Sequence, residues 1–121
     1  MRFKKFIMLL LFIVILIIIY IVFYNKIYRI NIVTNNVYEV LIKTSYPYQE
    51  KTLTDKKEIE MYLETLQKIR FTHPTINTGK GWETDVTIKS RNSDGINTEY
   101  RFFRLNNYIQ KGYFRYKIIS E

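Results

Sequence analysis

The sequence predicts an α+β protein in which one N-terminal transmembrane helix is followed by a small antiparallel sheet with a single packed helix (β-β-α-β-β-β). Three observations predict this class. Residues 6–24 are uninterruptedly apolar, residues 56–70 repeat apolar side chains at spacings of three and four, and most other segments alternate apolar and polar side chains. With 121 residues in total, the chain has room for one small domain beyond the apolar run.

The apolar run at residues 6–24 contains no charged residue, glycine or proline. A helix of this length extends roughly 28 Å at about 1.5 Å per residue, close to the hydrocarbon thickness of a bilayer. The run ends in Val-Phe-Tyr-Asn, which lacks the small residues that a signal peptidase needs, and no cysteine follows it to carry a lipid. We therefore expect a retained transmembrane helix, in preference to a core helix, a cleaved signal peptide or a lipoprotein anchor.

The charges that flank the apolar run predict its orientation. Three basic residues lie within residues 1–5, whereas two, Lys26 and Arg29, follow the run closely. Because the more basic flank usually stays in the cytoplasm, residues 1–5 are expected to form a cytoplasmic tail and residues 25–121 an extracytoplasmic domain. The expected location is the cell membrane, crossed once.

Two segments after the apolar run have the alternation of strands. Residues 28–34 and 37–42 each alternate with period two, and Asn35-Asn36 between them tolerates a left-handed backbone. This pattern predicts a hairpin. Residues 49–53 are expected to form a short extended lead into the next helix.

The clearest helix of the domain is expected at residues 56–70. Asp55 can cap its first turn, and Glu58 is placed to complete a capping box. The helix should end before His73-Pro74, because the residue before a proline avoids the helical conformation. It should lie across the sheet through an apolar stripe of Ile59, Tyr62, Leu63, Leu66 and Ile69.

Three strands are predicted after a loop at residues 79–81. They cover residues 82–90, 96–105 and 108–119, with turns at residues 93–95 and 106–107. In the first of them, one face should carry Trp82, Thr84, Val86 and Ile88, and the other Glu83, Asp85, Thr87 and Lys89.

The segment from residue 49 to residue 119 resembles a family of small uncharacterised extracytoplasmic domains of Gram-positive bacteria. The shared features are Thr-Asp-Lys-Lys-Glu-Ile at a helix start, a loop of about ten residues, and three tyrosine-rich strands that end in Tyr-Phe-Arg-Tyr-Lys-Ile. The resemblance implies anchoring by an N-terminal helix or a lipid, and it implies no activity. This chain departs from the family in its additional N-terminal hairpin and in Gly112-Tyr113, which replaces a Pro-Tyr pair.

The composition excludes several kinds of active site. Without cysteine, the chain cannot form a disulfide, a thiolate nucleophile, a Cys-ligated zinc site or an iron–sulfur cluster. His73 is the single histidine, and no serine motif accompanies it. Glu83 and Asp85 are too few for a calcium site and are expected to pair with basic side chains across the sheet. We therefore expect no enzyme, no cofactor and no metal.

Two short motifs also fail as nucleotide or nucleic-acid sites. Gly79-Lys80-Gly81 lacks the earlier glycine and the following Ser or Thr of a phosphate-binding loop. Residues 111–116 begin like the aromatic strand of an RNA-recognition motif, but Phe114 and Arg115 break that pattern. No nucleic-acid partner is expected.

The net charge of +8 favours an anionic partner, and the last strands carry a mixed basic and aromatic pattern. Arg101, Lys111, Arg115 and Lys117 are expected largely to share one solvent-facing side. Such a surface suits an anionic envelope polymer, lipid headgroups or an acidic protein, although it could also serve only for solubility. The full candidate surface consists of Tyr100, Arg101, Arg104, Tyr108, Lys111, Tyr113, Arg115 and Lys117.

These features together predict a non-catalytic, single-pass membrane protein whose outer domain contacts another protein or the anionic envelope. The alternative is an immunity or inhibitor protein that acts at the membrane surface against a toxin or an enzyme. Rings and arginines gathered in one patch would favour a protein partner, whereas dispersed basic charge would favour the envelope.

Overall fold

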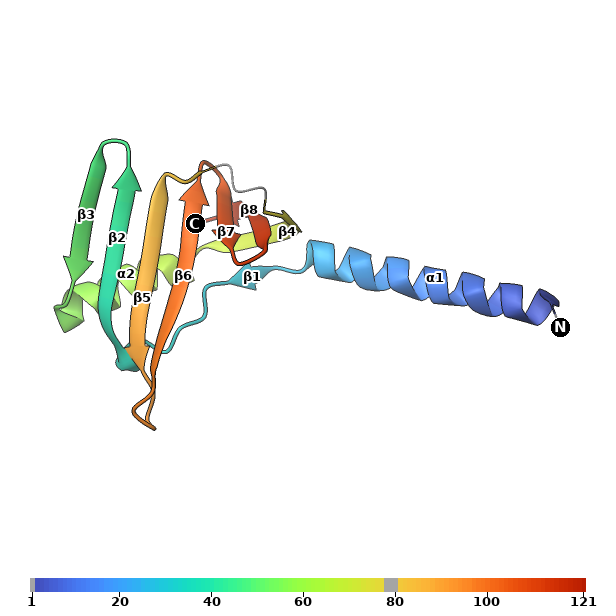
Figure 1. Ribbon diagram of the computed structural model, residues 1–121, viewed down its shortest axis with the longest axis horizontal. Coiled ribbons are helices and arrows are strands. Elements are labelled where there is room, and N and C mark those ends of the chain that lie inside the picture. Colours follow the sequence, from blue (N-terminus) through green and yellow to red (C-terminus); the bar gives the residue numbers. More distant parts are fainter. Residues whose placement is uncertain (1, 78–80) are drawn as a thin grey trace.

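The computed structural model describes residues 2–77 and 81–121 and consists of a long helix that projects from a compact sheet domain (Figure 1). Helix α1 (Arg2–Asn25) leads into an eight-stranded antiparallel sheet, one face of which is covered by helix α2 (Lys56–Gln67). The α+β class is therefore confirmed. Helix α1 is long and apolar enough to cross a membrane, and none of its most apolar stretch is buried against the domain.

The sheet has the strand order β1-β4-β8-β7-β6-β5-β2-β3. All neighbouring strands are antiparallel, and β8 lies between β4 and β7 although it comes last along the chain. The strands are β1 (Tyr28–Arg29), β2 (Val37–Ser45), β3 (Tyr48–Leu53), β4 (Arg70–Ile76), β5 (Thr84–Arg91), β6 (Asn97–Leu105), β7 (Tyr108–Lys111) and β8 (Phe114–Ser120).

The hairpin predicted at residues 28–34 and 37–42 is wrong. Residues 37–42 do form a strand, as part of β2, but within residues 28–34 only β1 is a strand. Strand β1 pairs with β4 and not with β2, and Thr34–Asn36 form a single 3-10 turn. Burial explains the difference, because Ile30 enters the core with 2% of its surface exposed. The Gln67 side chain donates a hydrogen bond to the Ile32 carbonyl at 3.0 Å, which replaces a bond that a hairpin would have provided.

The hairpin of the domain's N-terminal part lies instead between β2 and β3. Residues 49–53, expected as an extended lead, belong to β3, whose register with β2 runs from Ser45↔Tyr48 to Val40↔Leu53. The connecting turn contains a cis peptide bond between Tyr46 and Pro47. Strand β3 forms one edge of the sheet.

Helix α2 begins where the sequence predicts and ends three residues earlier. The Glu58 backbone N–H donates to the Asp55 carboxylate at 3.2 Å, which confirms the N-cap. The chain then enters β4, and His73-Pro74 lie inside this strand at a bulge, where the register with β8 shifts between Thr72 and Thr75. A bulge accommodates a proline because its missing N–H is not needed there.

The predicted strand at residues 108–119 is divided into β7 and β8 by a tight turn. Gly112 in this turn has φ +59°, a conformation that glycine adopts without strain. The strands predicted at residues 82–90 and 96–105 correspond to β5 and β6, and the turns at residues 93–95 and 106–107 are confirmed.

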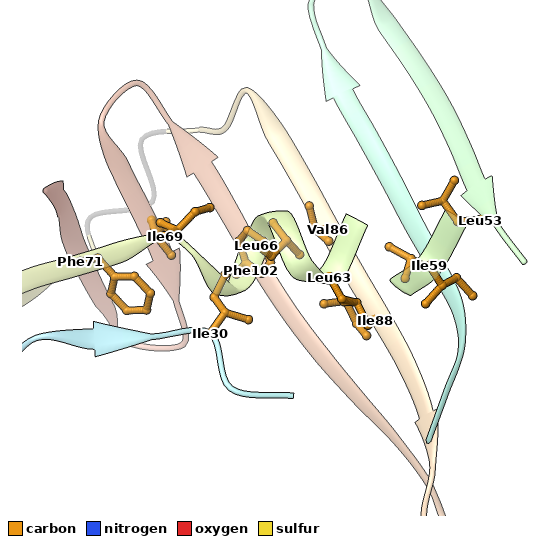
Figure 2. Close-up of a cluster of buried hydrophobic side chains, with 12 residues drawn as sticks. Ile30, Leu53, Ile59, Leu63, Leu66, Ile69, Phe71, Val86, Ile88 and Phe102 are labelled. Carbon is orange, nitrogen blue, oxygen red and sulfur yellow. The ribbon is translucent and has the colours of Figure 1, made fainter. Parts of the chain in front are cut away.

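The hydrophobic core lies between α2 and the sheet face beneath it (Figure 2). The predicted stripe of α2 supplies three buried residues, Tyr62 is half-buried, and Ile69 just after the helix is also buried. The sheet contributes side chains from six strands, β2 to β7, and Ile30 comes from the segment just after β1. The buried cluster consists of Ile30, Val40, Leu53, Ile59, Leu63, Leu66, Ile69, Phe71, Val86, Ile88, Phe102 and Ile109.

Candidate functional site

The sheet face opposite α2 carries the strongest candidate site, and we call it the open face. Because Val86, Phe102 and Ile109 belong to the core under α2, their strand neighbours point the other way. Direct cross-strand partners therefore form one row over seven strands on the open face. The row consists of Glu50 (β3), Lys43 (β2), Asp85 (β5), Phe103 (β6), Gln110 (β7), Arg115 (β8) and Thr75 (β4).

The eight predicted surface residues are divided between the two faces by the register. The open face carries Arg101, Tyr108, Arg115 and Lys117, whereas the α2 face carries Tyr100, Arg104 and Lys111, and Tyr113 lies in the β7–β8 turn. Lys111 was expected to lie on the same side of the sheet as Arg101, Arg115 and Lys117, and this expectation is wrong. The turn at Gly112 places Lys111 opposite Phe114, and its Nζ lies 4.0 Å from the centre of the Tyr100 ring.

An ion pair between an exposed arginine and a buried carboxylate lies on the open face. Asp85 is 3% exposed, and Arg101 donates to its two carboxylate oxygens from Nε at 3.1 Å and from Nη2 at 2.8 Å. The hydrogen bonds with Asp85 raise the pKa of Arg101, so this arginine stays charged. The cross-strand pairing expected for Asp85 is thus confirmed, whereas Glu83 lies exposed before β5.

Arginines and rings pair on the same face. The Arg101 guanidinium carbon lies 4.9 Å from the centre of the Phe103 ring, and that of Arg115 lies 3.9 Å from the Tyr108 ring. The Trp82 ring lies 6.3 Å from the Phe103 ring. Trp82 was expected to share the face of Val86, but it precedes β5 and packs against the open face.

A hollow of about 180 Å³ lies on this face beside Phe103, lined by Asn77, Gly81, Trp82, Phe103 and Gln110. Gln110 is 4% exposed, and its Nε2 has no hydrogen-bond partner. The Nε of Arg115, its cross-strand partner, is also buried without one. A buried polar group without a partner costs about 1–3 kcal/mol, so two neighbouring ones mark an unusual place in the fold.

The sequence did not reveal Trp82, Phe103 or Gln110 as site residues. Their contacts depend on which strands lie side by side, and residues 108–119 were expected to form one strand. One signal was present: Gln110 occupies a polar position directly after the apolar Ile109. The loop predicted at residues 79–81 lies outside the described residues apart from Gly81.

The junction between α1 and the sheet is a second organised region. The Thr72 hydroxyl lies 3.1 Å from the Tyr24 carbonyl and 2.8 Å from the Lys26 carbonyl, and it can donate to either oxygen. The His73 ring stacks on Tyr24 with 4.4 Å between centroids, and the Phe23 and Phe114 rings meet at 6.0 Å. These contacts hold the end of α1 against β4 and β8.

No cluster of side chains that could hold a metal ion is found in the part of the chain that the structure describes. Within residues 2–77 and 81–121, no three His, Cys, Asp or Glu side chains gather into a possible metal site. Comparison of the chain with protein-family models, with curated proteins and with solved structures gives no match.

Proposed function

We propose that the chain is a membrane-anchored, non-catalytic binding protein whose open face holds a segment of a partner protein outside the cytoplasm. The observation that carries the proposal is the Gln110 side chain at the hollow beside Trp82 and Phe103, because its buried Nε2 has no hydrogen-bond partner. A glutamine amide offers both a donor and an acceptor, which is the complement of a peptide group. The flanking rings supply apolar contact, as aromatic anchors do at protein interfaces.

The contacts of α1 support its retention as an anchor. Cleavage after Asn25 would remove α1 and, with it, three contacts of the domain. His73 would lose the stacked Tyr24 ring, Phe114 would lose the Phe23 ring, and Thr72 would lose one possible hydrogen-bond acceptor. A signal peptide that is cleaved off is not expected to make packing contacts with the mature domain. The excess of basic residues before α1 supports an outer location for the sheet.

The distribution of charge supports a protein partner over an anionic envelope. Arg101 and Arg115 gather with Phe103 and Tyr108 on one face, while other basic residues lie on the opposite face. Several cations are already neutralised, in the ion pairs Arg101–Asp85, Lys89–Glu39, Lys43–Glu50 and Arg104–Glu121. Three of these pairs, those of Arg101, Lys89 and Lys43, lie on the open face, and they lower the net charge that would attract a polymer or headgroups to it.

Site-specific photo-cross-linking of the full chain in native membranes tests the proposal. A photoreactive side chain at Lys117 on the open face should give a discrete protein adduct, and the same group at the exposed Met61 of α2 should not. Gln110→Leu keeps a side chain of similar size but removes the amide, so the adduct from position 117 should fall several-fold. Lys51→Leu on the edge strand β3 is the matched control.

Two results would contradict the proposal: equal adducts from positions 117 and 61, or an adduct that Gln110→Leu leaves unchanged while the domain stays folded. An adduct that disappears at 0.5 M salt and is unaffected by Gln110→Leu would favour electrostatic attachment. The identity of the captured protein distinguishes an immunity or inhibitor role from other binding roles. In that role, the captured protein is a toxin or an enzyme, and it should lose activity when the chain binds it.

A further inference from the structure

Three exposed apolar side chains lie together at the end of the domain that adjoins α1, and we call them the apolar lip. Ile76, Tyr113 and Phe114 have 78%, 88% and 38% of their surfaces exposed. Ile76 and Phe114 are direct partners between β4 and β8, and the Asn77 N–H donates to the Tyr113 carbonyl at 2.8 Å. In Figure 1, the end of β4 and the β7–β8 turn lie next to the end of α1.

The apolar lip lies at the depth at which α1 would leave a bilayer. Lys5 and Lys26 bracket the apolar part of α1. The roughly 20 residues between them, at about 1.5 Å each, give about 30 Å, the thickness of a hydrocarbon core. Phe23 is three residues inside this boundary, and its ring meets that of Phe114. Phe114 is therefore held within about one helical turn of the boundary between hydrocarbon and headgroups.

The composition of the lip suits this position. Tyrosine and other aromatic rings are enriched where a membrane protein meets the headgroups, because they combine an apolar body with a polar edge. Lys111 is the cross-strand partner of Phe114, so a cation accompanies the apolar group. In water, the same three side chains would form an exposed apolar cluster without a partner.

We propose that the apolar lip inserts into the headgroup region of the bilayer that α1 crosses, so that the domain contacts the membrane at a second point. The inference rests on the membrane anchoring in the proposed function, but it does not depend on the partner that the open face binds. Insertion of the lip would fix the tilt of the domain, since a body held at two points cannot pivot freely about its helix.

The absence of cysteine allows single labels to test this inference in the full chain. Variants Tyr113→Cys and Ile76→Cys, each carrying a fluorophore, are placed in phosphatidylcholine–phosphatidylglycerol nanodiscs. Asp94→Cys, in the β5–β6 turn at the far end of the sheet, is the aqueous control, and Val22→Cys in α1 is the membrane control. Quenching by lipids with a nitroxide near the headgroup is compared with quenching by aqueous iodide.

Labels at positions 113 and 76 should be quenched by the nitroxide lipid several-fold more than the label at 94, and several-fold less by iodide. The pattern should persist at 0.5 M salt, because the contact is mainly apolar. If positions 113 and 76 behave like 94 while position 22 is shielded from iodide, the inference is wrong and the anchor stands. If position 22 is itself exposed to iodide, the anchoring premise fails, and the inference fails with it.

Discussion

Tyr62 is the half-buried residue of the α2 stripe, and the fold strongly affects the titration of its hydroxyl. Burial raises the pKa of Tyr62 to about 12, and the nearby positive charge of Arg104 offsets part of that effect. The neutral hydroxyl is therefore favoured in the folded state, and folding stability depends on pH in the range where the unfolded tyrosine ionises.

We predict that the free energy of unfolding falls as pH rises from about 10 to about 12, because the unfolded chain loses the Tyr62 proton more readily than the folded chain does. A pKa difference of about two units corresponds to roughly 2.7 kcal/mol, of which about 2 kcal/mol is lost by pH 11.5. Tyr62→Phe should remove this part of the decline. The measurement is urea unfolding of the full chain in detergent, followed by Trp82 fluorescence at pH 9 and pH 11.5.

Tyr113→Phe is the matched control, since it removes an exposed hydroxyl from the β7–β8 turn. If both variants flatten the pH dependence equally, the decline arises from tyrosines in general and not from the burial of Tyr62.

At the scale of elements, the N-cap of α2 should make a measurable contribution to the free energy of unfolding. The Asp55 carboxylate accepts a hydrogen bond from the Glu58 N–H, which would otherwise lack a partner in the first turn. Asp55→Ala should lower the free energy of unfolding by about 1 kcal/mol, as measured by urea titration near pH 7. Glu60→Ala, on the exposed side of the same helix, should have little effect, and an equal loss in both variants would argue against the cap.

The elements that the sequence predicts correctly are those specified by neighbouring residues. The α2 stripe and its cap depend on residues a few positions apart, as do the turns at residues 93–95 and 106–107. Strand β4 was missed because His73-Pro74 suggest a stop, whereas pairing with β8, about 45 positions later, tolerates them at a bulge.

The same distinction applies to the candidate site. Alternation correctly places Arg101, Arg115 and Lys117 on one side of the sheet. It fails for Lys111, because the turn at Gly112 changes which residues face each other. Gln110 belongs to the site only because β6 and β8 place Phe103 and Arg115 on either side of it. The residues next to Gln110 in the sequence do not specify which strands become its neighbours.

At the scale of the whole molecule, the orientation across the membrane is open to a direct test. A reporter that is active only outside the cytoplasm, fused after Glu121, should be active in cells, because the more basic flank precedes α1. Deletion of Lys4 and Lys5 should reduce that activity. Activity of a cytoplasmic reporter at the same position would place the sheet domain inside the cell.

The central position of β8 determines when the domain can be completed. Before residues 114–120 have been synthesised, the pair β1–β4 beside α1 and the five strands from β7 to β3 have no strand to join them. Each part then presents an open hydrogen-bonding edge. Synthesis of residues 114–120 is thus the event that joins the two parts, and a chain arrested before it would expose both edges to proteases and to other unfinished chains.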